Sequence, residues 1–269
     1  MITFADSSMI PDLKQIWKEC FQDEDAYIDF YFQYRYADEN TLVWQEDKIP
    51  VAMLTLLPAH LFHKGNYEPL LYVYAVATKT AWRKKGISSR LLKAIDKNSV
   101  LVPATKQLFG FYEKAGYKNV FSLRQVEISV AEIKEDIQDI ACLPITSGEY
   151  KILRDQRFLK EGYVCWDLAA VTYALAENQF NGGFAYKVKQ GIKEDIVLGY
   201  QKGDRLYIKE TTVKGNDLKA VLKGLAKKQD CQHITAMLPI DAADIGTISE
   251  FGRSNFPVST EGYLGLALN

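Results

Sequence analysis

The sequence predicts a mixed α/β protein whose two halves follow one plan. Segments with apolar residues at helical spacing alternate with short strand-like runs along the 269 residues. In each half, a helical region is followed by three strand-like runs, an amphipathic helix and a short strand that ends at a proline. We therefore expect two domains in tandem, each with a mixed, mostly antiparallel, twisted sheet flanked by helices.

The elements of the first half are predicted from changes in the spacing of apolar residues. In the first helical segment, Leu13, Ile16 and Trp17 fall on one face. After residue 78 the spacing becomes helical again, with Ile87 and Leu91 one turn apart. The expected order is strand 2–5, helices 7–21 and 25–36, strands 41–45, 50–58 and 67–78, helix 87–98, strand 99–103, helix 106–116 and strand 121–130.

The second half is expected to repeat this order after an acidic stretch without a firm period. We place the domains at 1–132 and 147–269, with a linker at 133–146. Lys202 and Gly203 form a hairpin signal between two strand-like runs. The expected elements are a helical region 150–178, strands 182–188, 195–201 and 204–213, helix 216–228, strand 233–239 and a closing strand 262–269.

Charge and hydropathy exclude several classes of function. Lys and Arg number 33 against 34 Asp and Glu, which gives a net charge of −1. Such a balance provides no global field for nucleic acid or an anionic membrane, so we expect neither as a partner. There is no 18-residue apolar run and no signal-peptide pattern at the N-terminus. A cytoplasmic protein is therefore expected.

The cysteines and histidines do not form a metal-binding pattern. The four cysteines lie far apart without a CxxC pair, and the three histidines are not spaced to complete a zinc site with them. We expect reduced thiols and no bound metal.

A basic turn between a strand and a helix is the most informative stretch. Arg83, Lys84 and Lys85 precede Gly86, after which the helical pattern begins. The first N–H groups of a helix lack intrahelical partners, the helix dipole adds positive potential there, and glycine allows close approach of an anion. The stretch therefore predicts a pyrophosphate site, although a solvated basic turn is the commoner meaning of this pattern alone. The glycine patterns of a P-loop and of a dinucleotide fold are both absent.

Two motifs together resemble the GNAT superfamily of acyl-CoA-dependent N-acetyltransferases. The strand-to-helix signature of that family corresponds to VATKTAWRKKGIS, residues 76–88, and its second signature corresponds to FYEKAGY, residues 111–117. Ser88 and Thr105 depart from the residues most members have at these places, as does Thr80. The arrangement is similar to tandem-GNAT proteins, and the first half is similar to the enhanced-intracellular-survival type. No catalytic role is expected for Asn269.

The resemblance implies acetyl-CoA as co-substrate and a primary amine as acceptor. Its pyrophosphate would lie on the amides of residues 84–89, and its pantetheine would pair with the strand end. The cofactor-binding residues implied are Val76, Ala77, Thr78, Arg83, Lys84, Lys85, Gly86, Ile87, Ser88 and Ser89. Tyr112 is implied as the general acid, because a phenol is protonated at neutral pH and can donate to a departing thiolate. A buried core aromatic is the alternative for Tyr112.

The general base and the acceptor remain open. The acidic turn 23–25 is compatible with a cationic amine, and Glu19, Tyr72, Tyr74 or a water are equally possible as base. In the second half, residues 211–221 lack the Arg of the motif, and alignment of residues 250–256 with 111–117 places Phe251 opposite Tyr112. That half is therefore expected to be degenerate. Its possible pocket residues, with core packing as the alternative, are Glu161, Tyr163, Trp166 and Asp167.

Three other functions compete with an acetyltransferase. A non-catalytic acyl-CoA-binding module would bind cofactor without transfer. A tRNA-dependent aminoacyl transferase of the tandem-GNAT type predicts a basic groove, which a net charge of −1 does not favour. A structural protein that kept only the fold has no need for Arg83, Gly86 and Tyr112 together. The sequence does not indicate the oligomeric state.

Overall fold

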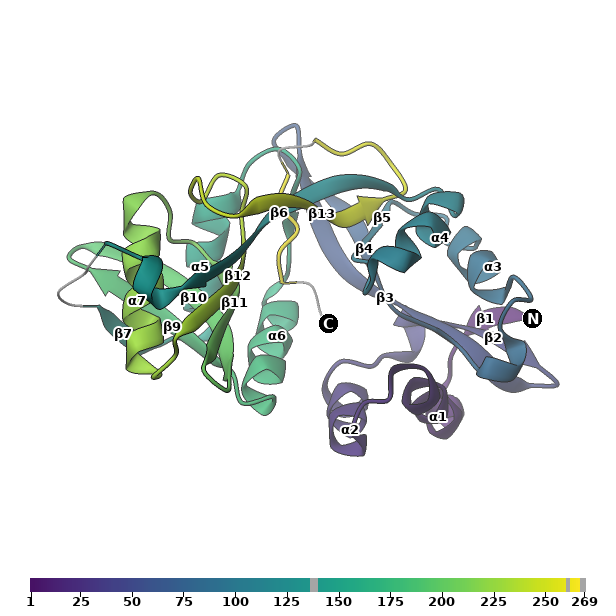
Figure 1. Ribbon diagram of the computed structural model, residues 1–269. Coiled ribbons are helices and arrows are strands. Elements are labelled where there is room, and N and C mark those ends of the chain that lie inside the picture. The colour runs from purple at the N-terminus through teal and green to yellow at the C-terminus, as the bar shows by residue number, and fades with distance from the viewer. Residues whose placement is uncertain (136–139, 260–261, 267–269) are drawn as a thin grey trace. The chain divides into compact units, whose positions relative to one another are not determined.

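The computed structural model describes residues 1–135, 140–259 and 262–266 (Figure 1). The chain forms two compact units that are not consecutive halves. Unit 1 comprises Met1–His60, Glu68–Lys118 and Gly252–Pro257, and unit 2 comprises Leu61–Tyr67, Asn119–Phe251 and Val258–Asn269. The chain therefore passes from one unit to the other more than once.

Unit 1 contains a mixed sheet in the strand order β1-β2-β3-β4-β5, followed by the end of β13. β1 pairs antiparallel with β2 and β2 with β3, whereas β4 pairs parallel with β5. The first-half elements are β1 (Ile2–Phe4), α1 (Ile10–Phe21), α2 (Asp25–Tyr34), β2 (Thr41–Glu46), β3 (Ile49–His63), β4 (Asn66–Thr78), α3 (Ile87–Lys93), β5 (Ser99–Leu101) and α4 (Phe109–Lys114).

Both faces of the unit 1 sheet are covered by helices. Figure 1 shows α3 and α4 on one face and α1 and α2 on the other. Leu54, Val73 and Leu91 share one apolar cluster on the α3 and α4 side. On the α2 side, the Tyr31 hydroxyl donates to Thr55 Oγ1 at 3.1 Å. The alternation of strand side chains between the two faces thus gives each pair of helices its own half of the core.

The strands of unit 2 have the order β13-β6-β12-β11-β10-β9-β7, and the described strands of both units belong to one sheet rather than to the two separate sheets expected. β11 and β12 pair in parallel, whereas the pairs β10–β11, β9–β10, β6–β12 and β7–β9 are antiparallel. The elements are β6 (Lys118–Ser129), β7 (Ala141–Pro144), α5 (Ser147–Phe158), β8 (Tyr163–Cys165), α6 (Leu168–Phe180), β9 (Phe184–Gln190), β10 (Lys193–Lys202), β11 (Arg205–Thr211), α7 (Asn216–Lys228), β12 (His233–Leu238) and β13 (Thr247–Ser254).

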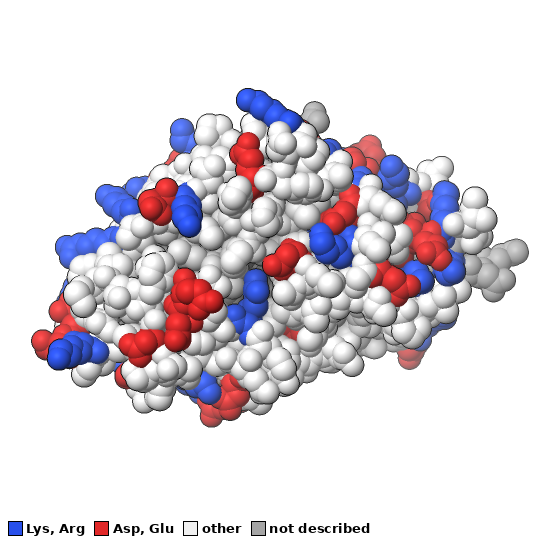
Figure 2. Space-filling view, turned by 180° about the vertical axis from the view of Figure 1, so that it is seen from behind, with Lys and Arg blue, Asp and Glu red and all other residues white. Residues whose placement is uncertain are grey.

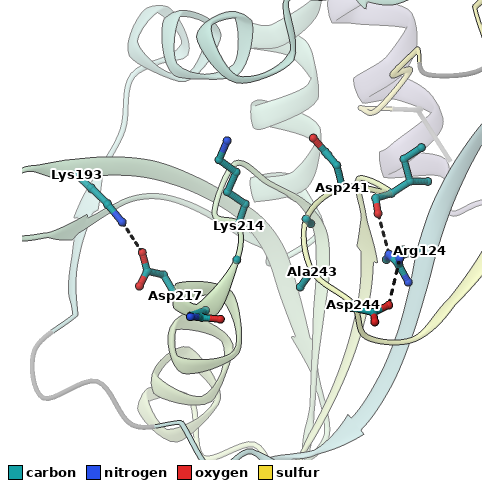
Figure 3. Close-up of a pocket in the computed structure, with 11 residues that line it drawn as sticks. Arg124, Lys193, Lys214, Asp217, Asp241, Ala243 and Asp244 are labelled. Carbon is teal, nitrogen blue, oxygen red and sulfur yellow. Dashed lines mark hydrogen bonds and ion pairs between the residues drawn. The ribbon is translucent and has the colours of Figure 1, made fainter.

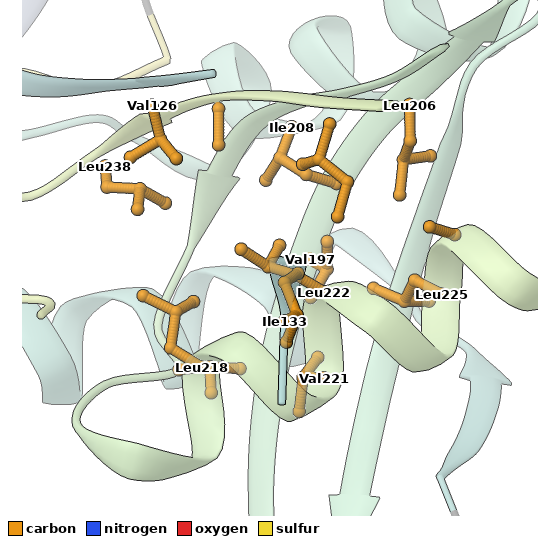
Figure 4. Packing of buried hydrophobic residues seen from close by; sticks show 14 of the residues in the cluster. Val126, Ile133, Val197, Leu206, Ile208, Leu218, Val221, Leu222, Leu225 and Leu238 are labelled. Atoms are coloured by element: carbon orange, nitrogen blue, oxygen red, sulfur yellow. The ribbon is translucent and has the colours of Figure 1, made fainter. Parts of the chain in front are cut away.

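Helix α7 provides the main apolar core of unit 2. Its apolar stripe, which includes Leu218, Val221 and Leu225, packs against Leu206 and Ile208 of β11 (Figure 4). All five side chains are at most 2% exposed. Burial of a leucine or isoleucine side chain stabilises a fold by about 1.5–3 kcal/mol, so this stripe fixes the position of α7 on the sheet.

A buried ion pair forms a second, polar core in unit 2. Arg154 of α5 and Glu210 of β11 are both fully buried, with Arg154 Nε 3.1 Å from Glu210 Oε2. The hydroxyls of Tyr150 and Tyr263 also donate to Glu210, at 2.6 and 2.9 Å. The Arg154 guanidinium also donates a hydrogen bond to the carbonyl oxygen of Leu264, at 3.1 Å. These bonds hold residues 262–266 to the unit without strand pairing.

Most of the expected elements are present, and the mixed α/β class is confirmed. The expected helical region 150–178 is divided by β8, because the chain turns at Gly162, which has φ +79° and packs on the backbone of Gly262. The helix that begins at Ile87 ends at Lys93 rather than near residue 98. The expected linker contains β7.

The end of the chain differs most from the expectation. Residues 262–266 are not in a strand, and residues 267–269, including Asn269, lie outside the described residues. The strand near the C-terminus is instead β13, which contains Phe251 and Arg253. The alignment of residues 250–256 with the helix at 111–117 is therefore wrong, because no helix follows β12 in the described part of unit 2.

We expect the buried ion pair to dominate the response of unit 2 to single substitutions. Arg154→Met leaves the Glu210 carboxylate buried without its cation and lowers the free energy of unfolding by about 3–5 kcal/mol. Lys193→Met removes the exposed partner of Asp217, which changes that free energy by at most about 1 kcal/mol. Urea unfolding followed by circular dichroism measures both, and equal losses would contradict the assignment of the pair as a buried core.

Candidate functional site

The candidate site begins where β4 extends beyond β5. Leu71 and Tyr72 pair in parallel with Ser99 and Val100, and β5 ends one residue later. β4 continues for six more residues to Thr78. The backbone groups of this extension that face the β5 side have no β5 residue opposite them. Such groups require another partner, and an extended ligand can provide it.

The extension also contains an irregular residue. Ala75 adopts φ +50° within β4, a left-handed conformation that non-glycine residues adopt at a cost of about 1–2 kcal/mol. Such a residue interrupts the regular pleat and changes the direction of the backbone groups that follow it. The next residues, Val76, Ala77 and Thr78, are the ones implied to pair with pantetheine. This feature could not be predicted from the sequence, because alanine is not typical of positive φ.

The turn after β4 exposes a run of unpaired amides. Lys84 and Gly86 are left-handed, with φ +62° and +76°. α3 begins at Ile87, and the first helical bond at this end runs from Arg90 N–H to Gly86 O at 3.1 Å. In the part of the chain that the structure describes, the N–H groups of residues 84–89 have no hydrogen-bond acceptor. Successive amides in turns with left-handed residues form concave anion sites.

Side chains attach this turn to the end of β4. Arg83 Nε donates to Thr78 O at 3.1 Å, and Ser88 Oγ lies 2.8 Å from Thr78 Oγ1. Thr78 is therefore bonded to residues on both sides of the turn. The guanidinium of Arg83 also donates to Cys20 Sγ at 3.5 Å. Arg83 was expected to supply charge to a pyrophosphate. Two of its five N–H donors are used within the protein, and its side chain is exposed.

The two lysines of the turn have different surroundings. Both are exposed. Lys85 Nζ lies 4.1 Å from the centroid of the Trp82 ring, in cation–π contact. Lys84 has no ion pair or ring contact with any described residue. The Lys84 ammonium is thus the basic group of the turn with the greatest freedom to meet an anion.

Tyr112 lies in the core beside the turn. It is 8% exposed and belongs to the same apolar cluster as Ile87, with Val76 packed against that cluster. Burial raises the pKa of Tyr112 to about 12. No hydrogen bond joins the Tyr112 hydroxyl to another described residue. The structure thus brings Tyr112 together with Ile87 and Val76, and its phenol remains protonated at neutral pH.

An aromatic cluster that was not singled out as a group lies across α1, α2 and β4. Trp17 is 4.4 Å from Tyr31 and 5.9 Å from Tyr74 between ring centroids, and the Tyr27 and Tyr74 hydroxyls are 3.5 Å apart. Tyr27 and Tyr74 are half-buried. Helical spacing predicted only that Trp17 faces a core, and the partners come from a distant strand.

The acidic turn 23–25 is largely engaged in contacts within the protein. Asp23 Oδ2 accepts from Trp17 Nε1 at 2.7 Å, and Asp25 pairs with Lys18 at 2.9 Å. Glu24 is exposed and has no ion pair among the described residues. Two of the three carboxylates that were considered for a cationic amine thus have structural partners.

The corresponding strand-to-helix junction of unit 2 lies on a pocket of about 710 Å³ (Figure 3). Its chemistry differs from that of the first junction because carboxylates lie among its basic groups. The lining residues are Arg124, Lys193, Lys214, Gly215, Asn216, Asp217, Ile240, Asp241, Ala242, Ala243 and Asp244.

Ion pairs neutralise most cations at this pocket. The pairs are Lys193 with Asp217 at 2.7 Å, Arg124 with Asp244 at 3.6 Å, and Arg157 with Asp241 at 2.8 Å. In the described residues, Lys214 alone among the basic lining residues has no ion pair. Gly215 N–H donates to Ala242 O at 2.6 Å, so it is not available to a ligand. A polyphosphate would meet more repulsion here than at residues 83–89.

The possible pocket residues of the second half have structural partners. Tyr163 is fully buried and accepts from Arg154, and Trp166 Nε1 donates to Gly265 O at 3.2 Å. Glu161 pairs with His63, and Asp167 caps α6 through the Ala170 N–H at 2.7 Å. The structure therefore favours core packing for Tyr163 and Trp166, whereas Glu161 and Asp167 are exposed and serve an ion pair and a helix cap.

The surface shows no concentration of one charge on the face seen from behind. Figure 2 shows basic and acidic side chains interspersed there. None of the described helices is long and apolar enough to span a membrane. Within the described ranges, no three His, Cys, Asp or Glu side chains are arranged to hold a metal ion.

Comparison with known proteins supports the fold class and the kind of enzyme. Residues 2–120 match the family described as acetyltransferase (GNAT) domain. Among solved structures, a GCN5-related N-acetyltransferase from Anabaena variabilis is 20% identical with a TM-score of 0.73, over 94% of this chain and 72% of that one. None of the curated proteins matches the sequence.

Two further structures share the fold over nearly the whole chain. A GCN5-related N-acetyltransferase from Kribbella flavida is 11% identical with a TM-score of 0.68, over 94% of this chain and 70% of that one. Eis1 from Mycobacterium abscessus is 13% identical with a TM-score of 0.67, over 97% of this chain and 74% of that one. At these identities the likeness establishes the fold, and the family match at residues 2–120 supports an acyltransferase.

We expect the left-handed conformation of Gly86 to be required for stability as well as for the site. A Cβ at Gly86 or at Gly110 meets no atom within 4 Å, so the two positions differ in backbone conformation rather than in space. Gly86→Ala lowers the free energy of unfolding by about 1 kcal/mol because φ is positive. Gly110→Ala, within α4, raises it by about 0.5–1 kcal/mol. Denaturant unfolding of both variants checks this, and the same sign for both would contradict it.

Proposed function

We propose that residues 1–132 form an acetyl-CoA-dependent N-acetyltransferase domain that acetylates a primary amine by direct attack. One observation carries the proposal. The N–H groups of residues 84–89 lack partners in the described structure, on a turn that is bonded to the end of β4 where β4 has left β5. The family match covers this turn. The residues present therefore fit the diphosphate and pantetheine of acetyl-CoA.

Backbone groups would perform most of the binding. The amides of residues 84–89 would donate to the pyrophosphate, and Lys84 would add a positive charge. The backbone of residues 76–78 would pair with pantetheine, and an N–H there would donate to the thioester carbonyl. Acetyl-CoA supplies the activated acetyl group as a thioester. The chain's own contribution is orientation and the stabilisation of charge on the carbonyl oxygen.

Tyr112 would donate the proton that the departing thiolate requires. Its raised pKa, caused by burial, favours the acid form at neutral pH. The same pKa makes the phenol unsuitable as a base. The amine would be deprotonated by another group or by water. Tyr112 packs in the cluster that contains Ile87, so it lies beside the turn that would hold the cofactor.

Unit 2 would not hold a second acetyl-CoA. The proposal for residues 147–269 is a degenerate domain, because the ion pairs at the Lys214 junction leave one basic lining residue without a carboxylate partner in the described structure. A non-catalytic acyl-CoA-binding protein would share the binding properties of unit 1 and lack transfer to any amine.

We expect one acetyl-CoA to bind per chain, at the turn. Lys84→Glu reverses the charge beside the pyrophosphate and raises the dissociation constant about ten-fold, which corresponds to about 1.4 kcal/mol. Lys93→Glu makes the same change at the other end of α3 and alters the constant by about two-fold at most. Isothermal titration calorimetry measures both affinity and stoichiometry. Absence of binding by the wild type at millimolar acetyl-CoA overturns the proposal, and two sites overturn the assignment of unit 2.

We expect Tyr112→Phe to separate binding from turnover. The variant keeps its affinity for acetyl-CoA and loses about 10²-fold in kcat, the usual size of a general-acid contribution. Since the phenol pKa is about 12, its acid form is complete at neutral pH and is lost only as the pH approaches that value. The ratio of wild-type to variant kcat is therefore constant between about pH 7 and pH 10.

The measurement is thiol release from acetyl-CoA in the presence of a panel of primary amines. Tyr117→Phe is the matched control, because Tyr117 is a neighbouring buried tyrosine whose hydroxyl bonds Ser99 at 2.7 Å. It is expected to change kcat by about two-fold at most. Unchanged turnover in Tyr112→Phe would reject the acid role.

A further inference from the structure

The last turn of α1 contacts the residues that lead into the amide-bearing turn. The carboxylate of Glu19 accepts a hydrogen bond from the Thr80 backbone N–H. This bond, with smaller contributions from the charges of Arg83 and Lys79, lowers the pKa of Glu19 below its ordinary value. The carboxylate is therefore ionised at neutral pH and accepts as a charged group.

Cys20, the next residue of α1, completes a closed set of bonds with the strand end. Its thiol lies 3.3 Å from Thr78 O, and its sulfur accepts from Arg83 Nη2 at 3.5 Å. Arg83 Nε in turn donates to the same Thr78 carbonyl at 3.1 Å. Thr78, Arg83 and Cys20 are thus joined pairwise, which brings the first and last residues of the segment 78–83 against α1.

Strand β3 and the first turn of α1 also hold this segment, through Lys79. Lys79 N–H donates to Val51 O at 2.9 Å, and Lys79 Nζ lies 3.9 Å from Asp12 in the first turn of α1. Lys79 and Thr80, two successive residues, are therefore fixed by a strand and by a helix. Among the described residues, the Thr80 N–H has no hydrogen-bond acceptor other than Glu19.

The residues that follow, 84–89, are not held by hydrogen bonds of their own N–H groups. Lys84 is left-handed although lysine does not favour that conformation, and the N–H groups of residues 84–89 make no hydrogen bond within the described chain. The N–H groups of residues 87–89 are directed by α3, which begins at Ile87. The direction of the amides of residues 84–86 must be set by the residues before and after them. Ser88 provides one anchor through Thr78, and the contacts with α1 provide the other.

We propose that Glu19 and Cys20 are positioning residues for the cofactor site, which hold Thr78 to Arg83 so that the amides of residues 84–89 converge on one anion. The inference rests on the proposed function for its ligand. We call the contacts of Glu19 with Thr80 and of Cys20 with Thr78 and Arg83 the clamp. These contacts are present in the protein without cofactor. Neither side chain is required to touch the cofactor, and neither is a catalytic residue.

Hydrogen exchange of the ligand-free protein tests the clamp directly. In Glu19→Ala, the Thr80 amide loses its acceptor, and the amides of residues 80–89 are expected to exchange about three-fold faster or more. Glu19→Gln keeps a side-chain oxygen that accepts from the same N–H, so its exchange is expected to match the wild type. Glu39→Ala is the control, since Glu39 is an exposed glutamate of the same unit and, among the described residues, makes no hydrogen bond or ion pair to this segment.

Calorimetry with acetyl-CoA tests the consequence for binding. We expect Glu19→Ala to raise the dissociation constant about five- to ten-fold, as for loss of a hydrogen bond to a charged group, with Glu19→Gln within about two-fold of the wild type. Cys20→Ala is expected to weaken binding about three-fold. Cys20→Ser retains a donor and an acceptor and is expected to recover most of that loss. Thermal unfolding of each variant checks that the unit remains folded.

The outcomes separate the two proposals. Faster exchange and weaker binding in the alanine variants, with rescue in Glu19→Gln, support the inference. Unchanged exchange in Glu19→Ala overturns it whatever the cofactor does. Faster exchange with no acetyl-CoA bound by the wild type retains the clamp and overturns the proposed ligand. An equal change of affinity in Glu19→Ala, Glu19→Gln and Glu39→Ala shows that the bond to Thr80 does not set the affinity, and overturns the positioning role.

Discussion

A strand that extends further than its neighbour leaves backbone groups that must find other partners, and the candidate site of this protein follows from that requirement. β4 runs six residues beyond its last pair with β5, to Thr78. The carbonyl of Thr78 is satisfied by Arg83 and Cys20. The turn that follows is fastened to this carbonyl, and its own amides are left unsatisfied. Unpaired backbone is tolerated at a surface where water or a ligand replaces the missing strand.

The two strand-to-helix junctions show how charge placement decides what such a surface can bind. At the first junction the carboxylate of Glu19 is occupied by the Thr80 amide, and Lys84 stands without an anionic partner in the described chain. At the second junction, Asp217 and Asp244 pair with the cations beside them, and Gly215 donates its N–H to the protein. A similar order of elements is therefore compatible with an anion site at the first junction, as we propose, and with a pocket neutralised by ion pairs at the second junction. The fold supplies the position, and a few side chains supply the chemistry.

Much of the fold was predictable because it depends on local patterns. The period of apolar residues located α1, α7 and most strands, and Gly86 with its basic neighbours located the turn. What could not be predicted depends on contacts between distant segments or on unusual backbone. The φ values of Ala75 and Lys84 contradict the preferences of those residues. A motif alignment indicated a helix at residues 250–256, where the structure has β13. The strand could not be predicted, because its pairing with β5 and its place in the sheet depend on residues that are distant in the sequence. Propensity carries no information on such pairings.

The direction of side chains was equally beyond the sequence, and it changes how the basic turn works. Three successive positive residues indicated recognition by charge, yet Arg83 is bonded to Thr78 and Cys20, and Lys85 lies on the Trp82 ring. An arginine has five donors in a rigid fork, which suits it to join a carbonyl and a thiol as well as to meet a phosphate. In the proposed site, most of the selectivity for an anion therefore comes from the backbone amides, whose directions are set by the conformation of the turn. A charge attracts any anion at some distance, whereas six amides that converge require one of a particular size and shape. The clamp from α1 matters for that reason, because backbone amides can select one anion only if the backbone that carries them is held in one conformation.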